Sequence, residues 1–218
     1  MPIPKVIYQT YSNKDAIPWM ARFHIWNMRR MNPEYEYRFY DDRAIEDFIK
    51  NEFKPEVYEQ YCKITIGAAK ADFFRYAILL KKGGIYLDID SRASGKFSNW
   101  INDDDKAIIT KEKNPGLYVQ WALVYTKDHP FLKNVLETVI DNIKNNRYPN
   151  DVLEMTGPNV YSRVIHECLR EYPTEEYRLF GIDYEGKMKF KYWLSGFSFR
   201  KKEHWRQSQK ERPILSEE

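Results

Sequence analysis

Cysteine is scarce in this chain, and long apolar runs are missing. The two cysteines, Cys62 and Cys168, form no Cys-x-x-Cys pair, which argues against a zinc site of that type and against a disulfide framework. Reduced thiols in a cytosol-like, cytoplasmic compartment are therefore expected. No apolar run approaches the roughly 18 residues of a membrane-spanning helix, and the first residues lead straight into a predicted strand without a signal peptide. We expect a soluble protein, or one soluble domain of a longer chain, with no membrane span.

Excess charge of one sign is also missing. The 35 Lys and Arg residues nearly balance the 32 Asp and Glu residues, and a net charge of +3 gives no indication of nucleic acid as a partner. A content of 31% charged and 43% hydrophobic residues is typical of a globular chain, and 218 residues suffice for one well-cored domain. Aromatic residues reach 16%, which suits either stacking on bases and sugars or, for most of them, an aromatic core.

The most informative stretch is 82–90, Lys-Gly-Gly-Ile-Tyr-Leu-Asp-Ile-Asp. Gly83 and Gly84 permit a sharp turn, and the apolar β-formers after them predict a buried strand. Because residues i and i+2 of a strand share a face, Asp88 and Asp90 are expected to present two neighbouring carboxylates. Such a pair suits a hard divalent cation. A solvated turn is the ordinary interpretation of Asp-x-Asp, but a buried strand places these carboxylates where open α/β sheets bind ligands.

The segment 66–82 predicts a largely buried helix that leads directly into this turn. Its apolar surface is interrupted by Lys70, Asp72 and Arg75. Asp72 and Arg75 are three residues apart and are therefore neighbours on the helix surface. An intrahelical ion pair is the simple explanation, but a charge beside a core usually has a specific partner. We expect this polar patch to lie near Asp88 and Asp90.

The N-terminal part predicts a strand over 3–8 and then a polar loop, 9–13. Gln9, Thr10 and Tyr11 in this loop suit contacts to a nucleotide base, and an ordinary surface loop fits equally well. A helix is predicted after Pro18, and its aromatic stripe assigns Trp19 and Trp26 to the core. Further strands are predicted at 35–40, 107–110 and 117–125, further helices at 43–51, 55–61, 130–145 and 159–170, and a loop at 150–158. Asp41 and Asp42 are expected to cap the helix at 43–51, and His129 is expected to start the helix at 130–145.

Four segments carry a family resemblance: 3–10 (Ile-Pro-Lys-Val-Ile-Tyr-Gln-Thr), 32–37 (Asn-Pro-Glu-Tyr-Glu-Tyr), 71–76 (Ala-Asp-Phe-Phe-Arg-Tyr) and 83–90. Together they resemble the DXD-containing sugar transferases of glycosyltransferase family thirty-two. The resemblance is strong over residues 3–95 and weaker afterwards, where 156–158 (Thr-Gly-Pro) and 204–205 (His-Trp) match family landmarks. The Ala-Asp-x-x-Arg helix joined through Gly-Gly to the Asp-x-Asp strand is its most specific part.

This resemblance implies an α/β protein of the GT-A fold, a Rossmann-like mixed sheet flanked by helices, over residues 1–205. The charged composition of residues 206–218 predicts a frayed tail. It implies a retaining transferase that moves a hexose from a nucleotide diphosphate donor, UDP-sugar first and GDP-sugar second, to a glycan or glycoprotein acceptor. It also implies a divalent cation, Mn²⁺ or Mg²⁺.

The resemblance also assigns roles to single residues. The metal ligands are Asp88, Asp90 and His204, and the catalytic set is Asp72, Arg75, Asp88 and Asp90. The residues assigned to nucleotide binding are Gln9, Thr10, Tyr11, Asp72 and Asp88. The residues assigned to binding of the donor sugar or the acceptor are Asp72, Arg75, Trp121, Gly157 and Trp205.

Two alternatives compete with a transferase. A phosphohydrolase of the haloacid-dehalogenase type also places Asp-x-Asp after an apolar strand, but Ser91 and Arg92 differ from its usual following residues and the pair lies far from the start of the chain. A non-catalytic module would bind a nucleotide sugar without turning it over.

Overall fold

The computed structural model describes residues 1–191 and 209–216. The described residues form a main sheet of six strands in the order β2 (Glu36–Tyr40), β1 (Val6–Thr10), β3 (Gly84–Leu87), β6 (Ala122–Tyr125), β5 (Ala107–Lys111) and β7 (Arg178–Ile182). Strand β6 runs antiparallel to both of its neighbours, while the other pairs are parallel. A second pairing joins two short strands, β4 (Arg92–Ala93) and β8 (Met188–Lys189). The predicted mixed α/β sheet flanked by helices is therefore confirmed.

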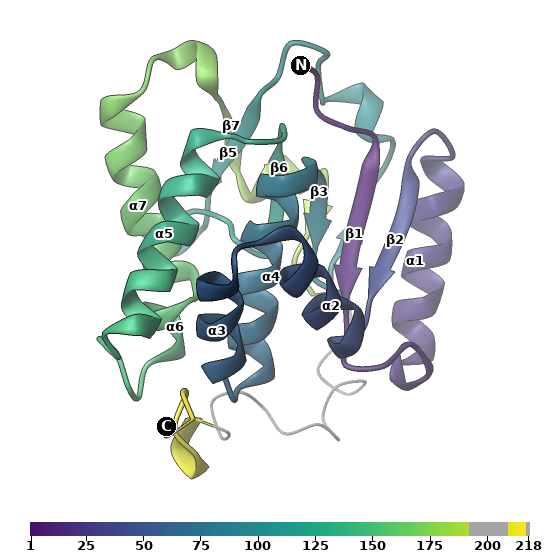
Figure 1. The fold of residues 1–218 in the computed structure, drawn as a ribbon. Coiled ribbons are helices and arrows are strands. Elements are labelled where there is room, and N and C mark those ends of the chain that lie inside the picture. The colour runs from purple at the N-terminus through teal and green to yellow at the C-terminus, as the bar shows by residue number, and fades with distance from the viewer. Residues whose placement is uncertain (192–208, 217–218) are drawn as a thin grey trace.

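Helices cover both faces of the sheet (Figure 1). One helix, α1 (Trp19–Met31), lies beside β1 and β2. The other face carries α2 (Asp42–Glu52), α3 (Pro55–Lys63), α4 (Gly67–Lys82), α5 (Pro130–Lys144), α6 (Val152–Met155) and α7 (Pro158–Glu171). None of the helices in residues 1–191 and 209–216 has the length and apolar character needed to cross a bilayer.

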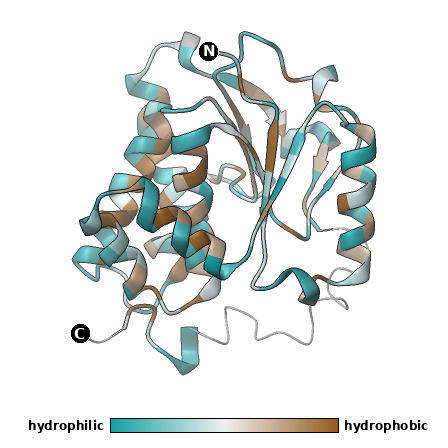
Figure 2. Ribbon diagram, turned by 45° about the vertical axis from the view of Figure 1, so that its right-hand side comes forward, coloured by the Kyte–Doolittle hydropathy of each residue, from teal (hydrophilic) through white to brown (hydrophobic). Residues whose placement is uncertain are grey.

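The strands alternate their side chains between two cores, as the period of a β-strand requires. Tyr8, Tyr86 and Tyr125 enter the cluster beneath α4, α5 and α7. Their neighbours Ile7 and Ile85 enter the opposite cluster instead. Hydrophobic residues accordingly lie along the central strands in Figure 2. This burial on both faces fixes where each strand ends, and hence where its polar terminal residues emerge.

Most predicted elements are present, and the caps predicted at Asp41 and His129 are confirmed, while Asp42 is the first residue of α2 and not its cap. Asp41 Oδ1 accepts a hydrogen bond from the Ala44 amide at the start of α2. His129 Nδ1 accepts one from the Phe131 amide at the start of α5. The loop predicted over 150–158 was wrong in part, because it contains the short helix α6, whose cap is Asp151. Strand β7 was not predicted.

The prediction that Trp19 and Trp26 are core residues was wrong. The two indoles are 73% and 56% exposed, and α1 instead buries Ala21, Ile25 and Met28. Both stripes have the same i, i+4, i+7 spacing, so the period of the helix does not distinguish them. The stripe of Ala21, Ile25 and Met28 faces the sheet because its smaller, aliphatic side chains let α1 approach the sheet closely.

The charged end of the chain also differs from the prediction. Within its described part, 209–216, Ile214 and Leu215 are buried against the main core. The Thr65 amide donates to the Ile214 carbonyl over 2.9 Å, and the Ser216 amide donates to the Lys63 carbonyl over 2.8 Å. Two apolar side chains in a charged segment are enough to fix it against the end of α3.

Candidate active site

The centre of the candidate site is built by α4 and the turn that follows it. Asp72 and Arg75 lie on α4 and are both buried. The helix ends at Gly83 (φ +65°), and Gly84 (φ +111°) begins β3. A β-carbon on Gly84 would lie 2.7 Å from the Val6 carbonyl oxygen, so this tight return requires glycine. The turn aligns α4 with β3 and brings both ends of the stretch to one edge of the sheet, as predicted.

Asp88 and Asp90 lie in a turn, and the prediction that a strand continues through Asp90 was wrong. Pairing between β3 and β6 ends at Leu87, and only the Asp88 amide still donates, over 2.8 Å, to the Trp121 carbonyl. The Ser91 amide then closes the turn on the Asp88 carbonyl at 3.0 Å. The side chain between the two carboxylates, Ile89, packs against α1. The pair is thus anchored on both sides.

Arg75 joins the two aspartates of the site. Its Nη2 atom lies 2.9 Å from Asp88 Oδ1 and 3.1 Å from Asp72 Oδ1. Its guanidinium also lies over the ring of Tyr86, 4.9 Å from the centroid, and the Tyr86 hydroxyl donates to Asp88 Oδ1 over 3.1 Å. The predicted proximity of the helix patch to Asp88 is therefore confirmed. A planar, permanently charged group suits this arrangement because it can serve several acceptors at once.

Sequence reasoning missed two residues that complete this network. Gln120 Oε1 accepts from Arg75 Nη1 over 2.7 Å, and Gln120 Nε2 donates to Asp72 Oδ1 over 2.9 Å. Thr156 Oγ1 donates to Asp72 Oδ2 over 3.1 Å. Gln120 comes just before the antiparallel strand β6, whose first residues lie at the same edge as the end of β3. The polar character of Gln120, directly before a buried strand, could have identified it as a site residue. Thr156 belongs to the Thr-Gly-Pro segment at 156–158, in which only Gly157 had been given a role.

The three carboxylates of the site have raised pKa values. Burial raises the pKa of Asp72 to about 6, although Arg75 opposes the rise. Burial and the neighbouring Asp88 carboxylate raise the pKa of Asp90 to about 6 as well. Burial also raises the pKa of Asp88. Arg75 contacts Asp72 and Asp88 but not Asp90, and the charges of Arg75 and Lys191 only partly offset the effect of burial on Asp88 and Asp90. A further positive charge would therefore stabilise the ionised carboxylates.

The N-terminal residues reach the same edge in different ways. Gln9 and Thr10 belong to β1 and are buried, so their assignment to a loop was wrong. Gln9 Nε2 donates to the Asp88 carbonyl over 3.2 Å, while the Thr10 hydroxyl donates to the Tyr40 carbonyl over 2.8 Å. Tyr11 begins the loop, and both its burial and the nearby Asp90 raise the pKa of its hydroxyl. Nucleotide contacts by these three residues remain predictions.

The site also offers polar atoms for a ligand. Gln9 Oε1, Ser91 Oγ and Arg75 Nε are buried and have no hydrogen-bond partner among the described residues. Such groups are rare in folded proteins unless something else binds them. These atoms belong to residues that lie beside Asp88 or contact it. The candidate site therefore contains polar atoms whose hydrogen-bonding capacity is not used within the described residues.

The two carboxylates suit a divalent cation shared with a phosphate ligand. Within the part of the chain that the structure describes, no three His, Cys, Asp or Glu side chains are grouped closely enough to hold a metal ion alone. Mg²⁺ and similar ions commonly take one or two carboxylates and complete their shell with phosphate oxygens and water. Asp88 and Asp90 fit that pattern. The predicted third ligand, His204, lies outside the described residues.

Three other predicted contact residues have different surroundings. The Trp121 indole is buried against Tyr184 and Phe190, and only its carbonyl reaches the site, at Asp88. Gly157 precedes α7, and a β-carbon there would lie 2.8 Å from Leu153 Cα. Sugar or acceptor contacts by Trp121 and Gly157 therefore remain predictions. Trp205 lies outside the described residues.

Comparison with solved structures identifies the fold. The fold matches the PaToxG glycosyltransferase with a TM-score of 0.64 and 19% identity, covering 79% of this chain and 71% of that one. It also matches the UDP-bound glycosyltransferase domain of the YGT toxin, with a TM-score of 0.56 and 9% identity over 88% of this chain and 80% of that one. The fold is that of GT-A glycosyltransferases.

Comparison of sequences defines the family. The model of the glycosyltransferase sugar-binding region containing the DXD motif matches residues 19–107. An uncharacterized glycosyltransferase, L373, of Acanthamoeba polyphaga mimivirus is 30% identical over 84% of this chain and 72% of its own length. The initiation-specific alpha-1,6-mannosyltransferase of Schizosaccharomyces pombe is 26% identical over 77% of this chain and 49% of its own. The chain belongs to this family of DXD-containing glycosyltransferases and spans about half the length of the mannosyltransferase it matches.

Family membership separates the alternatives. It identifies the chain as a glycosyltransferase and overturns the haloacid-dehalogenase alternative, because the family model that contains the DXD motif matches residues 19–107, a range that includes Asp88 and Asp90.

Proposed function

We propose that the chain transfers a hexose from a nucleotide diphosphate sugar to a glycan or protein-linked acceptor, with a divalent cation bound at Asp88 and Asp90. The observation that carries this proposal is the contact of Arg75 with both Asp72 and Asp88 at the carboxyl edge of β3. A network this buried holds its carboxylates in one geometry, which is what positioning of a sugar ring requires.

Each part of the network has a role in the proposed reaction. The bond between the anomeric carbon and the diphosphate oxygen breaks, the acceptor oxygen bonds to the same carbon, and the acceptor proton passes to the departing diphosphate. Asp72 would accept hydrogen bonds from sugar hydroxyls, and Arg75 would keep its carboxylate and that of Asp88 in place. A bound cation would neutralise the charge that develops on the leaving diphosphate. Gln9 and Tyr11 would contact the nucleotide.

The donor is the least determined part of the proposal. A UDP-hexose is the first candidate and a GDP-hexose the second. The names of relatives that are mannosyltransferases, including the inositol phosphoceramide mannosyltransferase 3 of Schizosaccharomyces pombe, favour mannose as the sugar to include among the donors tested.

The test measures release of UDP or GDP from UDP-glucose, UDP-galactose and GDP-mannose, with Mn²⁺, with Mg²⁺ and with a chelator. We expect one nucleotide to be released only with metal, and Asp90→Asn to lower the rate by about a hundredfold or more, since metal stabilisation of a leaving group is worth several kcal/mol. Asp104→Asn is the matched control, because Asp104 is exposed in a distant turn. Metal-dependent binding of a nucleotide sugar without release would support the non-catalytic module instead.

A further inference from the structure

The outer face of α1 exposes three large aromatic side chains. Trp19, Phe23 and Trp26 are 73%, 52% and 56% exposed, and their spacing places them on one side of the helix. The rings of Phe23 and Trp26 lie 5.9 Å apart, so they form a contiguous surface. Large aromatics are usually buried, and a group of them on a surface marks a place where the molecule contacts something apolar.

The same helix is basic. Its 13 residues include Arg22, Arg29 and Arg30 and no Asp or Glu. None of these arginines forms an ion pair with a carboxylate of residues 1–191 or 209–216, because the ion pairs described there involve other side chains. The Arg30 guanidinium lies instead over the ring of Trp26, 5.3 Å from its centroid. Arg22 donates to the carbonyl oxygens of Lys14, Asp15 and Ile17, so the positive charge that α1 offers to an external anion is that of Arg29 and Arg30.

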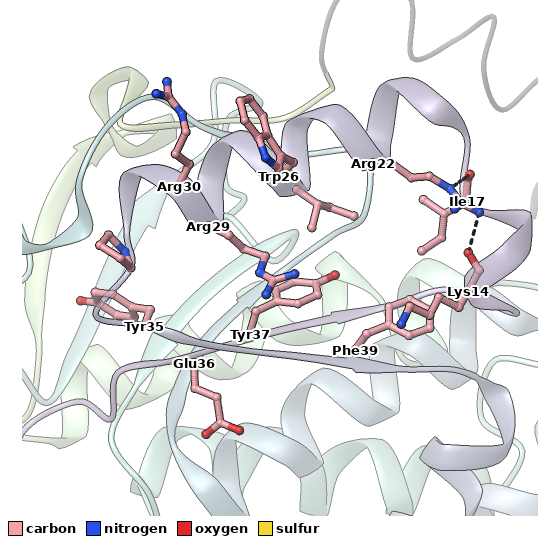
Figure 3. A pocket seen from close by; sticks show the side chains of 12 residues that line it. Lys14, Ile17, Arg22, Trp26, Arg29, Arg30, Tyr35, Glu36, Tyr37 and Phe39 are labelled. Carbon is pink, nitrogen blue, oxygen red and sulfur yellow. Dashed lines mark hydrogen bonds between the residues drawn. The ribbon is translucent and has the colours of Figure 1, made fainter.

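A groove beside α1 continues this chemistry. It has a volume of about 690 Å³ and lies between α1 and β2 (Figure 3). Among the described residues that line it, Glu36 alone carries a carboxylate, and this group is bonded to Arg38 at 2.7 Å. Figure 3 shows Arg29 directed into the groove over Tyr37, while Trp26 and Arg30 project on the side away from β2. A ligand with both anionic and apolar groups could therefore contact basic and aromatic side chains of the same helix.

We propose that this face of α1 binds the surface of a lipid bilayer that contains anionic lipids. Indole rings settle at the level of lipid headgroups, phenyl rings enter the acyl boundary, and arginines bind the phosphates around them. The observed order, an aromatic stripe bordered by guanidinium groups, matches that layering. An acidic protein surface would complement the arginines, but it would leave Trp19 and Phe23 without an apolar environment.

The inner face of α1 gives this contact a consequence for the site. Ala21 and Ile25 of α1, together with Ile17 just before the helix, pack against Ile89, the residue between Asp88 and Asp90. A bilayer bound to the outer face would therefore hold the site beside the membrane surface. The proposed contact does not depend on the transferase activity, because vesicle binding can be measured without any donor.

The experiment is co-sedimentation of the whole chain with phosphatidylcholine vesicles, with and without phosphatidylglycerol. We expect sedimentation with the anionic vesicles, weakened by high salt. The triple variant Trp19→Ser/Phe23→Ser/Trp26→Ser should abolish it. Arg29→Gln and Arg30→Gln should each weaken it by about fivefold, the contribution of one basic residue near an anionic surface. Circular dichroism confirms that each exposed substitution leaves the fold intact.

Matched controls use exposed residues on the other side of the molecule. Leu179→Ser/Ile182→Ser removes two exposed apolar side chains from β7, and Lys133→Gln/Lys144→Gln removes two exposed charges from α5. Both should sediment like the wild type. Failure to sediment with either vesicle, or equal losses in the controls, would overturn the proposal. Binding to an acidic protein such as immobilised polyglutamate without binding to vesicles would also overturn it and would assign the face to a protein partner.

Discussion

Replacing Arg75 by Met tests the central network most directly. The substitution keeps an unbranched apolar stem but removes the guanidinium that contacts Asp72 and Asp88. Asp72 would remain buried and Asp88 partly buried, and both would lose this positive partner. Breaking a buried ion pair by removing one side costs about 3–5 kcal/mol, because the remaining charge is left uncompensated.

A second ion pair of the molecule supplies the comparison. Lys82 Nζ lies 2.6 Å from Glu52 Oε1, closer than the Arg75 contacts, but both side chains are more than a third exposed. Exposed pairs contribute about 0–1 kcal/mol because water screens them. Lys82→Met should therefore cost at most about 1 kcal/mol. Burial, not distance, decides the difference between the two substitutions.

The assay is urea unfolding followed by tryptophan fluorescence at pH 8 and pH 5. Losing Arg75 raises the pKa of Asp72 further above its folded value of about 6, so the variant binds protons more readily than the wild type. The deficit of Arg75→Met should consequently shrink as the pH falls from 8 to 5. A cost no larger than that of Lys82→Met, or a cost that is the same at both pH values, would refute the electrostatic account of the network.

Three further predictions concern residues around the site. Thr156→Val should lower the free energy of unfolding by about 1–3 kcal/mol, since it removes a hydrogen bond to the buried Asp72, and Thr156→Ser should restore it. Gly84→Ala should cost about 1–3 kcal/mol because of its positive φ and crowding, whereas Gly95→Ala, with open space around it, should cost little. Burial lowers the pKa of His129 below 6.5, so this side chain binds more protons in the unfolded state and lowers stability as the pH drops below about 6.5, whereas the raised pKa values of Asp72 and Asp90 act in the opposite direction. His129→Asn removes only the first effect, so the melting temperature of the variant should gain on that of the wild type as the pH falls, and a constant difference would contradict the buried neutral cap.

Much of the site could be predicted because its parts are close in sequence. Asp72 and Arg75 lie on α4, Asp88 directly follows β3, and the Gly83-Gly84 turn between α4 and β3 fixes the direction of return. Local rules of helix spacing and turn geometry are sufficient for that step. Gln120 and Thr156 were missed because they reach Asp72 from 48 and 84 residues away. Only the pairing of β6 with β3 and the packing of α6 and α7 against α4 bring them there.

The sequence by itself determined the alternation of strands and helices, the Gly-Gly turn and the charge pair on α4, since these depend on neighbours along the chain. The tertiary structure decided which stripe of α1 faces the sheet, because the aromatic and aliphatic stripes share one period and only the space available against β1 and β2 selects between them. It also decided that Asp88 and Asp90 occupy a turn, since the strand ends where β6 ceases to pair with it. The same packing leaves Trp19, Phe23 and Trp26 on the surface, where the spacing of residues alone predicts a core.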